Sequence, residues 1–311
     1  MRRSTLAIVS ILLLGLALFA AGCGGKKGSS SSSGSTAEST TEAGAESATG
    51  GAAAEGGETA DAAACTPAKM ETHSAETLTI ATDKPAYPPY FEDGKPENGE
   101  GFEGAVGYAI GEQLGYSKEQ IKWTVEPFDS SYAPGPKNFD FDLNEISITP
   151  VREKAVDFSA PYYTAKQAVV ALEGSEAAKA KTLAELKETK FGVQINTTSL
   201  KAVEEFIEPS SKPEVFNSSG DVVTALKNGQ VEAVVVDLPT ALYLTEVQVE
   251  NASIVGQFGN AEGEEWGALL AKESPLTECV SGAIEALEKS GELEKITQRW
   301  MSQAANAPEL H

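Results

Sequence analysis

The chain carries, near its middle, the stretch Ile146-Ser-Ile-Thr-Pro-Val-Arg152-Glu-Lys-Ala-Val-Asp-Phe-Ser-Ala-Pro-Tyr-Tyr163. Arg152 is one of only four arginines in a chain with 20 lysines. A planar guanidinium can donate two parallel hydrogen bonds to a carboxylate, which a lysine cannot do. Arg152, with Ser147 and Thr149 just before it, is therefore a candidate carboxylate-binding residue. The alternative is a surface arginine in an exposed ion pair, which would contribute little.

Strand and helix patterns alternate on both sides of this stretch. The expected strands cover residues 78–82, 121–125, 143–148, 167–172, 191–195 and 231–236. The expected helices cover 104–114, a segment that starts with the capping box Thr182-x-x-Glu185, 198–207, a segment capped by Asp221 and stopped by Gly229, and two C-terminal segments. Strands that alternate with helices predict an α/β fold with mostly parallel sheets.

Polar and aromatic side chains follow several of these strands. In α/β folds, ligands bind at the carboxyl ends of strands, where helices present their N-termini. Four places meet this description: 87–90, 149–152, 196–199 and Asp237. They come from both halves of the chain, which predicts a cleft between two lobes.

Each of these places also has a purely structural explanation. Thr197 and Thr198 could donate hydrogen bonds to an anion or could cap the helix that follows them. Asp237 could pair with an ammonium group or could cap the next helix. The remaining candidates are aromatic and could line the cleft or belong to the core: Tyr87, Tyr90 and Phe128.

Residues 1–22 have the features of a secretory signal. Arg2 and Arg3 precede an apolar run from Leu6 to Ala21, which is shorter than the ~20 residues needed to span a bilayer. The sequence Ala20-Ala-Gly-Cys23 resembles a bacterial lipobox, so we expect Cys23 to be acylated; a free signal-peptidase site is the alternative. Gly, Ser, Ala and Thr fill 33 of the 41 positions from 24 to 64, so residues 23–64 are expected to form a lipidated, disordered tether.

Two cysteines remain, Cys65 and Cys279. Because an exported protein meets oxidising conditions, we expect a disulfide between them, with two buried thiols as the alternative. A bond would close a loop of about 214 residues and stabilise the fold by ~4–5 kcal/mol on the chain-entropy model. It would also place the start of the folded part beside the last helices.

The composition excludes several classes of function. The net charge of −22 argues against nucleic-acid binding, because phosphates would be repelled. Two histidines, His73 and His311, and the lack of a Cys-x-x-Cys pair argue against a metal site. There is no Walker A loop, no G-x-G-x-x-G and no G-x-S-x-G motif. We therefore expect neither a metal nor a cofactor.

Several motifs follow one another in a specific order. They are 78–82 with Asp83, Tyr87-Pro-Pro-Tyr90 and Gly101-Phe-Glu, then 146–163, 192–198, 233–237 and 291–300. This series resembles the bacterial extracytoplasmic solute-binding proteins of family 3, the amino-acid receptors of ABC importers, over residues 75–303. The resemblance implies a two-lobed α/β fold of the periplasmic-binding-protein-like type II, with lobe 1 at 65–167 and 261–311 and lobe 2 at 168–260.

The resemblance also implies a role for each candidate residue. Arg152 would clamp the α-carboxylate of the ligand with help from Thr149, Thr197 and Thr198, and Asp237 would hold the α-ammonium group. The other residues implied to bind the ligand or line its side-chain pocket are Asp83, Tyr87, Tyr90, Phe128 and Ser147.

Three places depart from the family pattern. Ala105 stands where an acidic residue is usual, Asn196 stands where glycine is usual, and Asn144-Glu145 stands where small residues are usual. If Glu145 faces the cleft, it would favour a cationic ligand side chain or replace part of the ammonium site. If it faces solvent, it would have no role.

Together these features predict a monomeric extracytoplasmic receptor, held to the membrane by its lipid. It would bind a polar or charged amino acid and deliver it to an ABC permease without catalysis. Two alternatives remain at this point. One is a sensor without transport, and the other is a cyclohexadienyl-dehydratase-like enzyme that uses Glu145 and Asp237 as general acid and base.

Overall fold

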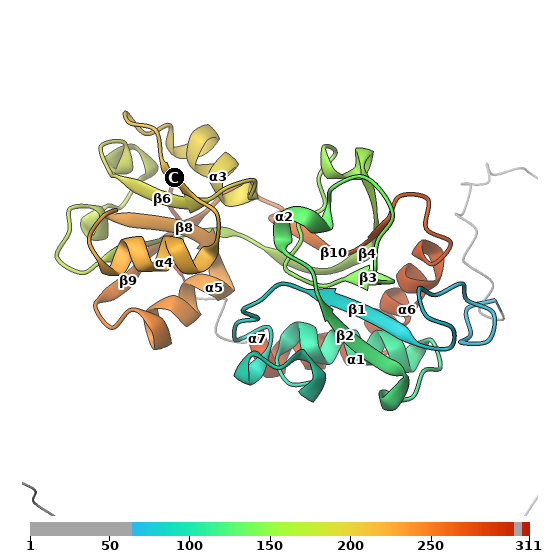
Figure 1. Cartoon of the computed structure of the whole chain (residues 1–311). Coiled ribbons are helices and arrows are strands. Elements are labelled where there is room, and N and C mark those ends of the chain that lie inside the picture. The colour runs from blue at the N-terminus through green and yellow to red at the C-terminus, as the bar shows by residue number, and fades with distance from the viewer. Residues whose placement is uncertain (1–63, 302–306) are drawn as a thin grey trace, which may run out of the picture. The chain divides into compact units, whose positions relative to one another are not determined.

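The computed structural model describes residues 64–301 and 307–311, which belong to one compact unit (Figure 1). The predicted signal, Cys23 and all of the predicted tether except its last residue lie outside the described residues. Two five-stranded sheets form the frame, and each belongs to one lobe. No helix in the described part of the chain is long and apolar enough to cross a membrane.

The first lobe is built on the sheet with strand order β2-β1-β3-β10-β4. Its strands are β1 (Leu78–Thr82), β2 (Ile121–Val125), β3 (Phe141–Asp142), β4 (Val156–Ala165) and β10 (Glu264–Ala271). Its helices are α1 (Phe102–Gln113), α2 (Phe128–Ser131), α6 (Thr277–Lys289) and α7 (Glu292–Met301). Buried Val106 and Ile110 of α1 pack in one core with Val280 and Ile284 of α6.

The second lobe is built on the sheet with strand order β7-β6-β8-β5-β9. Its strands are β5 (Gln167–Leu172), β6 (Phe191–Gln194), β7 (Glu214–Phe216), β8 (Ala233–Asp237) and β9 (Ala252–Phe258). Its helices are α3 (Thr198–Ala202), α4 (Ser219–Lys227) and α5 (Leu238–Tyr243). Apolar cores cover both faces of this sheet, which explains why β5 and β8 are apolar almost throughout.

Single turns of tighter or wider helix complete the two lobes. The 3-10 turns are Glu92–Gly94, Pro96–Asn98, Lys118–Gln120, Arg152–Lys154, Ala177–Lys179 and Leu183–Leu186, and the π turns are Val203–Ile207 and Leu244–Gln248.

Both sheets are mixed, so the expectation of mostly parallel sheets is wrong. β1 runs parallel to β2 and β3, but β10 is antiparallel to β3 and β4. In the second sheet β6 is parallel to β7 and β8, but β5 is antiparallel to β8 and β9. The antiparallel pairs arise where the chain changes lobe, because β4 leads directly to β5 and β9 leads to β10. The two-lobed α/β architecture itself is as predicted.

The C-terminal residues 307–311 lie on the second lobe, not on the first as expected. The backbone of Glu309 forms a single parallel β-bridge with Gln257 on β9, and Leu310 is buried in the core of the second lobe. A salt bridge of 2.7 Å joins Glu309 to Lys166, the residue between β4 and β5. The expectation failed because it followed the last helix, whereas the chain returns to the other lobe after α7.

Three local expectations also differ from the structure. The helix expected from Thr182 is a single 3-10 turn, and Glu185 accepts the N–H of Lys181 instead of that of Thr182. The cap of helix α4 lies three residues before the expected one, because the Ser218 hydroxyl accepts the N–H of Asp221. In place of the strand expected at 143–148, strand β3 covers Phe141–Asp142 and ends there. The chain then turns away at Glu145, whose φ is +48°.

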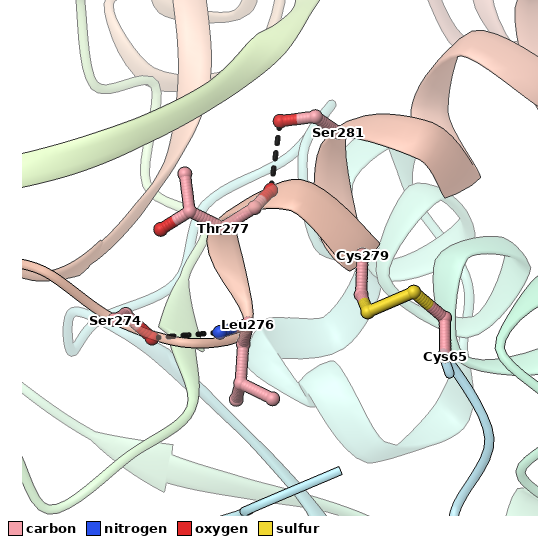
Figure 2. Close-up of a disulfide and its surroundings, with 6 residues drawn as sticks. All are labelled: Cys65, Ser274, Leu276, Thr277, Cys279 and Ser281. Atoms are coloured by element: carbon pink, nitrogen blue, oxygen red, sulfur yellow. Dashed lines mark hydrogen bonds between the residues drawn. A yellow bond between two sulfur atoms is a disulfide. The ribbon is translucent and has the colours of Figure 1, made fainter. Parts of the chain in front are cut away.

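Cys65 and Cys279 form a disulfide, as predicted, with their Cα atoms 5.4 Å apart (Figure 2). Cys279 lies in the first turn of α6, whose start is held by Ser274 and Ser281. The Ser274 hydroxyl accepts the N–H of Leu276, and the Ser281 hydroxyl donates to the carbonyl of Thr277. The beginning of the folded part is therefore fastened to α6 of the first lobe.

Candidate functional site

One cavity collects nearly all the candidate residues named from the sequence. Its volume is about 160 Å³, and segments of both sheets line it. Ten of the eleven candidates are among its lining residues: Asp83, Tyr87, Tyr90, Phe128, Glu145, Ser147, Arg152, Thr197, Thr198 and Asp237. Thr149 lines a neighbouring groove instead, and its hydroxyl accepts the N–H of Arg152 at 3.3 Å.

Arg152 is buried at the cavity wall of the first lobe and touches both lobes. Its Nη1 donates to the carbonyl of Ser147 at 2.8 Å, and its Nη2 donates to the carbonyl of Asn196 at 3.2 Å. The guanidinium also lies 5.4 Å from the ring centre of Phe128 and 5.0 Å from that of Tyr132. Burial lowers the pKa of Arg152, but a guanidinium stays charged at neutral pH. The exposed-ion-pair alternative is thus wrong.

The turn between β6 and α3 forms the opposite wall. Asn196 has a φ of +61°, a left-handed conformation that Asn tolerates better than most residues. The Thr197 hydroxyl caps α3 by accepting the N–H of Leu200. The Thr198 hydroxyl lies 3.3 Å from that of Ser147, which joins the two lobes beside Arg152.

Asp237 ends β8 at the cavity and is held by Gln167 on the neighbouring strand. The Gln167 amide donates to Oδ1 of Asp237 at 2.6 Å, and Ser199 donates to the oxygen of the same amide. Burial, followed by repulsion from Glu264, raises the pKa of Asp237 to about 8, although Gln167 and Arg152 oppose the shift. The side chain makes no capping bond to α5, so that alternative is wrong.

Aromatic side chains enclose the rest of the cavity. Tyr90 is buried against Trp266, and its hydroxyl shares a hydrogen bond of 2.8 Å with Thr240 of the second lobe. Tyr87 is half-buried, with its ring 6.3 Å from that of Tyr243 across the lobes. Phe128 packs edge-on to Tyr132 at 5.5 Å. Aromatic walls of this kind suit the apolar part of a small ligand.

Glu145 faces the cavity, which decides between the two orientations left open by the sequence. It lines the cavity, and its backbone N–H donates to the Glu103 carboxylate at 2.7 Å. Burial, and then the charge of Glu103, raise the pKa of Glu145 well above its usual value. Asp83 lies on the same side, and burial raises its pKa as well.

Sequence reasoning missed several polar lining residues: Gln194, Ser218, Ser219 and Thr240. Ser218 and Ser219 could have been found, because they open α4, and the start of that helix was placed three residues too late. Gly220 follows them, and a Cβ there would lie 3.3 Å from the hydroxyl of Tyr87. In the described part of the chain, no group of three or more His, Cys, Asp or Glu residues could hold a metal.

Solved structures of binding proteins share this fold. An ancestral arginine-binding protein, solved with bound glutamine and with bound arginine, matches with a TM-score of 0.62 in both cases. It is 32% identical, and the match covers 72% of this chain and 97% and 98% of those chains.

Curated relatives cover most of the folded part of the chain. The arginine-binding extracellular protein ArtP of Bacillus subtilis is 28% identical over 77% of this chain and 92% of its own length. The L-cystine-binding protein TcyJ of Escherichia coli is 27% identical over 69% of this chain and 79% of its own length. These relatives are binding proteins and not enzymes, which agrees with the prediction of a protein without catalysis. A family model for the bacterial extracellular solute-binding proteins, family 3, matches residues 78–303, and the chain belongs to that family.

Proposed function

We propose that this protein is an extracytoplasmic receptor that binds one amino acid between its lobes and delivers it to an ABC permease. The supporting observation is a guanidinium and a carboxyl group in one cavity. Arg152 comes from the first lobe and Asp237 from the second, close enough that Arg152 lowers the pKa of Asp237. The two groups match the α-carboxylate and α-ammonium groups of an amino acid, because the ammonium group favours the ionised form of Asp237 and neither ligand charge is then buried unpaired.

Each wall of the cavity then has a role in binding. Arg152 clamps the α-carboxylate, with the hydroxyls of Ser147 and Thr198 as additional donors. Asp237 accepts hydrogen bonds from the α-ammonium group and is oriented by Gln167. Thr149 acts indirectly, because its hydroxyl fixes the turn that carries Arg152. Thr197 acts indirectly too, because its hydroxyl is engaged in capping α3.

The size of the cavity and the names of the relatives support an amino acid as the ligand. A volume of about 160 Å³ is below the ~300–1,000 Å³ of sites for larger organic ligands, and it suits a single amino acid. The relatives ArtP and TcyJ are named for arginine and cystine, which are charged or polar amino acids. We therefore propose a polar or charged amino acid for this chain.

Contact with both lobes explains how binding would become a signal to a permease. A ligand held by Arg152 and Asp237 favours the arrangement in which the lobes stand together, and a ligand can shift a two-state equilibrium only by such differential contacts. We further propose that acylated Cys23 holds the receptor to the extracytoplasmic face of the cell membrane, and that it acts there as a monomer.

Thermal unfolding against the amino acids tests the proposal. The chain from residue 24 onward would be secreted so that its disulfide forms, then unfolded and refolded to remove ligand. A ligand present at 1,000 times its Kd stabilises by ~4 kcal/mol, which corresponds to a rise in Tm of roughly 8–16 °C for a protein of this size. We expect such a shift with at least one polar or charged amino acid. If no amino acid at 10 mM raised the Tm, the proposal would be wrong.

A further inference from the structure

Two carboxyl groups meet at the floor of the cavity. Glu145 lines the cavity, and Glu103 of α1 is wholly buried behind it. Oε1 of Glu103 accepts two hydrogen bonds, from the N–H of Glu145 and from the hydroxyl of Tyr162. Oε2 of Glu103 is also buried but has no hydrogen-bond partner among the described residues. The pair therefore has an acceptor that an added proton can satisfy, and Glu145 is its member at the cavity wall.

An unused donor lies at the same place. Asn144 is nine-tenths buried and lines the same cavity, yet its Nδ2 has no hydrogen-bond partner among the described groups. Buried polar atoms are nearly always hydrogen-bonded in folded proteins. An unused buried donor in the wall of a cavity is what a binding site shows when its ligand completes the hydrogen bonding.

The groups around Glu145 are mostly acidic. The carboxyls of Glu103, Asp83 and Asp237 act on it from α1, from the end of β1 and from the end of β8. The hydroxyls of Tyr90 and Tyr162 also face it, and Asp142 of β3 lies behind Glu103. Among the residues that line the cavity, the cations are Arg152 and the exposed Lys84. With Arg152 committed to the α-carboxylate and Asp237 to the α-ammonium group, Glu145 is left without a counter-charge.

Two buried carboxyl groups in contact cannot both be ionised without cost, so they hold a proton between them. Burial raises the pKa of both Glu145 and Glu103. The neutral Glu145 carboxyl donates a hydrogen bond to the Glu103 carboxylate, which raises the pKa of Glu145 further and opposes the rise at Glu103. A cation placed beside Glu145 would reverse this effect, because a positive charge favours the ionised form.

We propose that the Glu103–Glu145 pair is a proton-exchanging subsite for the cationic end of the ligand's side chain. The empty subsite holds one proton on the pair. When a guanidinium or ammonium group docks, the pair releases that proton to the solvent and binds the cation with the charge thus exposed. The inference rests on the proposed function, because it extends the ligand from its α-groups to its side chain.

The exchange makes binding of a cationic ligand depend on pH. Below the pKa of the pair, each unit of falling pH weakens the binding of arginine up to about tenfold, because a proton must be displaced. Glutamine has a side chain that carries no charge, so it leaves the proton on the pair in place. Both ligands displace the proton of Asp237 alike, so the affinity for arginine has the steeper dependence on pH. The ratio of the two affinities therefore rises with pH.

Calorimetry with the chain from residue 24 onward tests this, using arginine and glutamine as probes. Titrations at one pH in two buffers of different ionisation enthalpy give the number of protons released on binding. We expect up to one proton more for arginine than for glutamine, because both ligands place an ammonium group on Asp237 but only arginine ionises the pair. Glu145→Gln should abolish this difference and weaken the binding of arginine at least about 30-fold, while the affinity for glutamine changes less than threefold. Glu153→Gln, at an exposed acid outside the cavity, is the matched control and should behave as the wild type.

Each result supports or overturns the inference. Equal proton release by arginine and glutamine from pH 5 to pH 8 would overturn it, and so would a Glu145→Gln variant that keeps its affinity for arginine. The proton count on the wild type does not depend on whether a variant folds, and binding of glutamine shows that Glu145→Gln is folded. Binding of glutamine but not arginine would refute the subsite and leave the proposed function intact. Failure to bind any amino acid would refute both.

Discussion

The Arg152 guanidinium of the first lobe donates through Nη2 to the carbonyl oxygen of Asn196 in the second lobe, at 3.2 Å. The residue proposed to clamp the ligand is therefore also a link between the lobes. Its other terminal nitrogen is engaged within the first lobe by the carbonyl of Ser147. A ligand carboxylate, as a stronger acceptor than a carbonyl, would compete for these donors and so couple binding to the contact between the lobes.

Arg152→Lys should lower the affinity for the amino-acid ligand about 100-fold, because an ammonium group cannot reach the ligand, Ser147 and Asn196 together. Isothermal titration of the folded variant measures the effect. Arg299→Lys is the matched control, since Arg299 is exposed on α7 and contacts the Trp300 ring at 4.6 Å. Equal affinities for wild type and Arg152→Lys would rule out Arg152 as the clamp.

The hydrogen bond between Tyr90 and Thr240 should contribute to holding the lobes together before any ligand binds. A double-mutant cycle with Tyr90→Phe and Thr240→Val should give a coupling of about 1 kcal/mol in the free energy of unfolding. Tyr108→Phe serves as the control partner, because its hydroxyl donates within the first lobe to the carbonyl of Glu97. Additive effects for Tyr90 and Thr240 would show that the bond contributes nothing in solution.

The ligand-free protein should lose stability as the pH rises. The pKa of Asp237 is about 8 in the folded protein against an ordinary value of 3.8, so the folded state binds more protons between these limits. The contribution of protonated Asp237 to the free energy of unfolding is fully present below about pH 4 and is lost as the pH rises through 8. Asp237→Asn should flatten this slope and raise the free energy of unfolding at pH 8 by on the order of 2 kcal/mol.

Urea unfolding without ligand at pH 5, 6, 7 and 8 measures the slope. Part of the decrease in stability with pH should persist in Asp237→Asn, because burial also raises the pKa values of Glu103, Glu145 and Asp142. The control is Asp93→Asn at an exposed aspartate, which should keep the full slope. A wild-type protein that gained stability from pH 5 to pH 8 would contradict the expectation.

The C-terminal residues should stabilise the second lobe through Leu310. This side chain is buried over Gly256 of β9, where an added Cβ would lie 2.6 Å from Leu310 Cγ. Leu310→Ala should lower the free energy of unfolding by about 2 kcal/mol. Gly256→Ala should also lower it, because the added methyl group would displace Leu310 from its place on β9. Since both changes remove one contact, the double variant should be little worse than the single ones. Fully additive losses would mean that the two residues act independently.

Several expectations from the sequence succeeded because each rested on a local chemical requirement. The strands at 78–82, 121–125 and 167–172 have the predicted bounds, since runs of apolar residues between turns leave few alternatives. Arg152 and Asp237 line one cavity, as expected for polar side chains that follow strands, and their roles in binding stay predictions. The family followed from the order of the motifs.

The failures concern long-range features that no local pattern records. Residues 143–148 read as a strand, but the backbone turns at Glu145 because Glu103, 42 positions away, accepts its N–H. The sequence predicts Asp221 as the cap of α4, whereas Ser218 performs that role. For this reason Ser218 and Ser219 were not predicted to line the cavity. The return of residues 307–311 to the second lobe depends on the contact between Leu310 and Gly256. This contact joins residues far apart in the sequence, so no local pattern predicts it.

The disulfide between Cys65 and Cys279 also determines how the molecule responds to mechanical tension. If the chain is held by a lipid on Cys23, a pull along residues 24–64 reaches Cys65 first and passes through the sulfur atoms into α6. The disulfide shares this pull with residues 66–77, so strand β1, which follows them, bears less of it. A receptor held in flowing or crowded surroundings would thus keep Asp83 and Tyr87, which follow β1, in place around the ligand cavity.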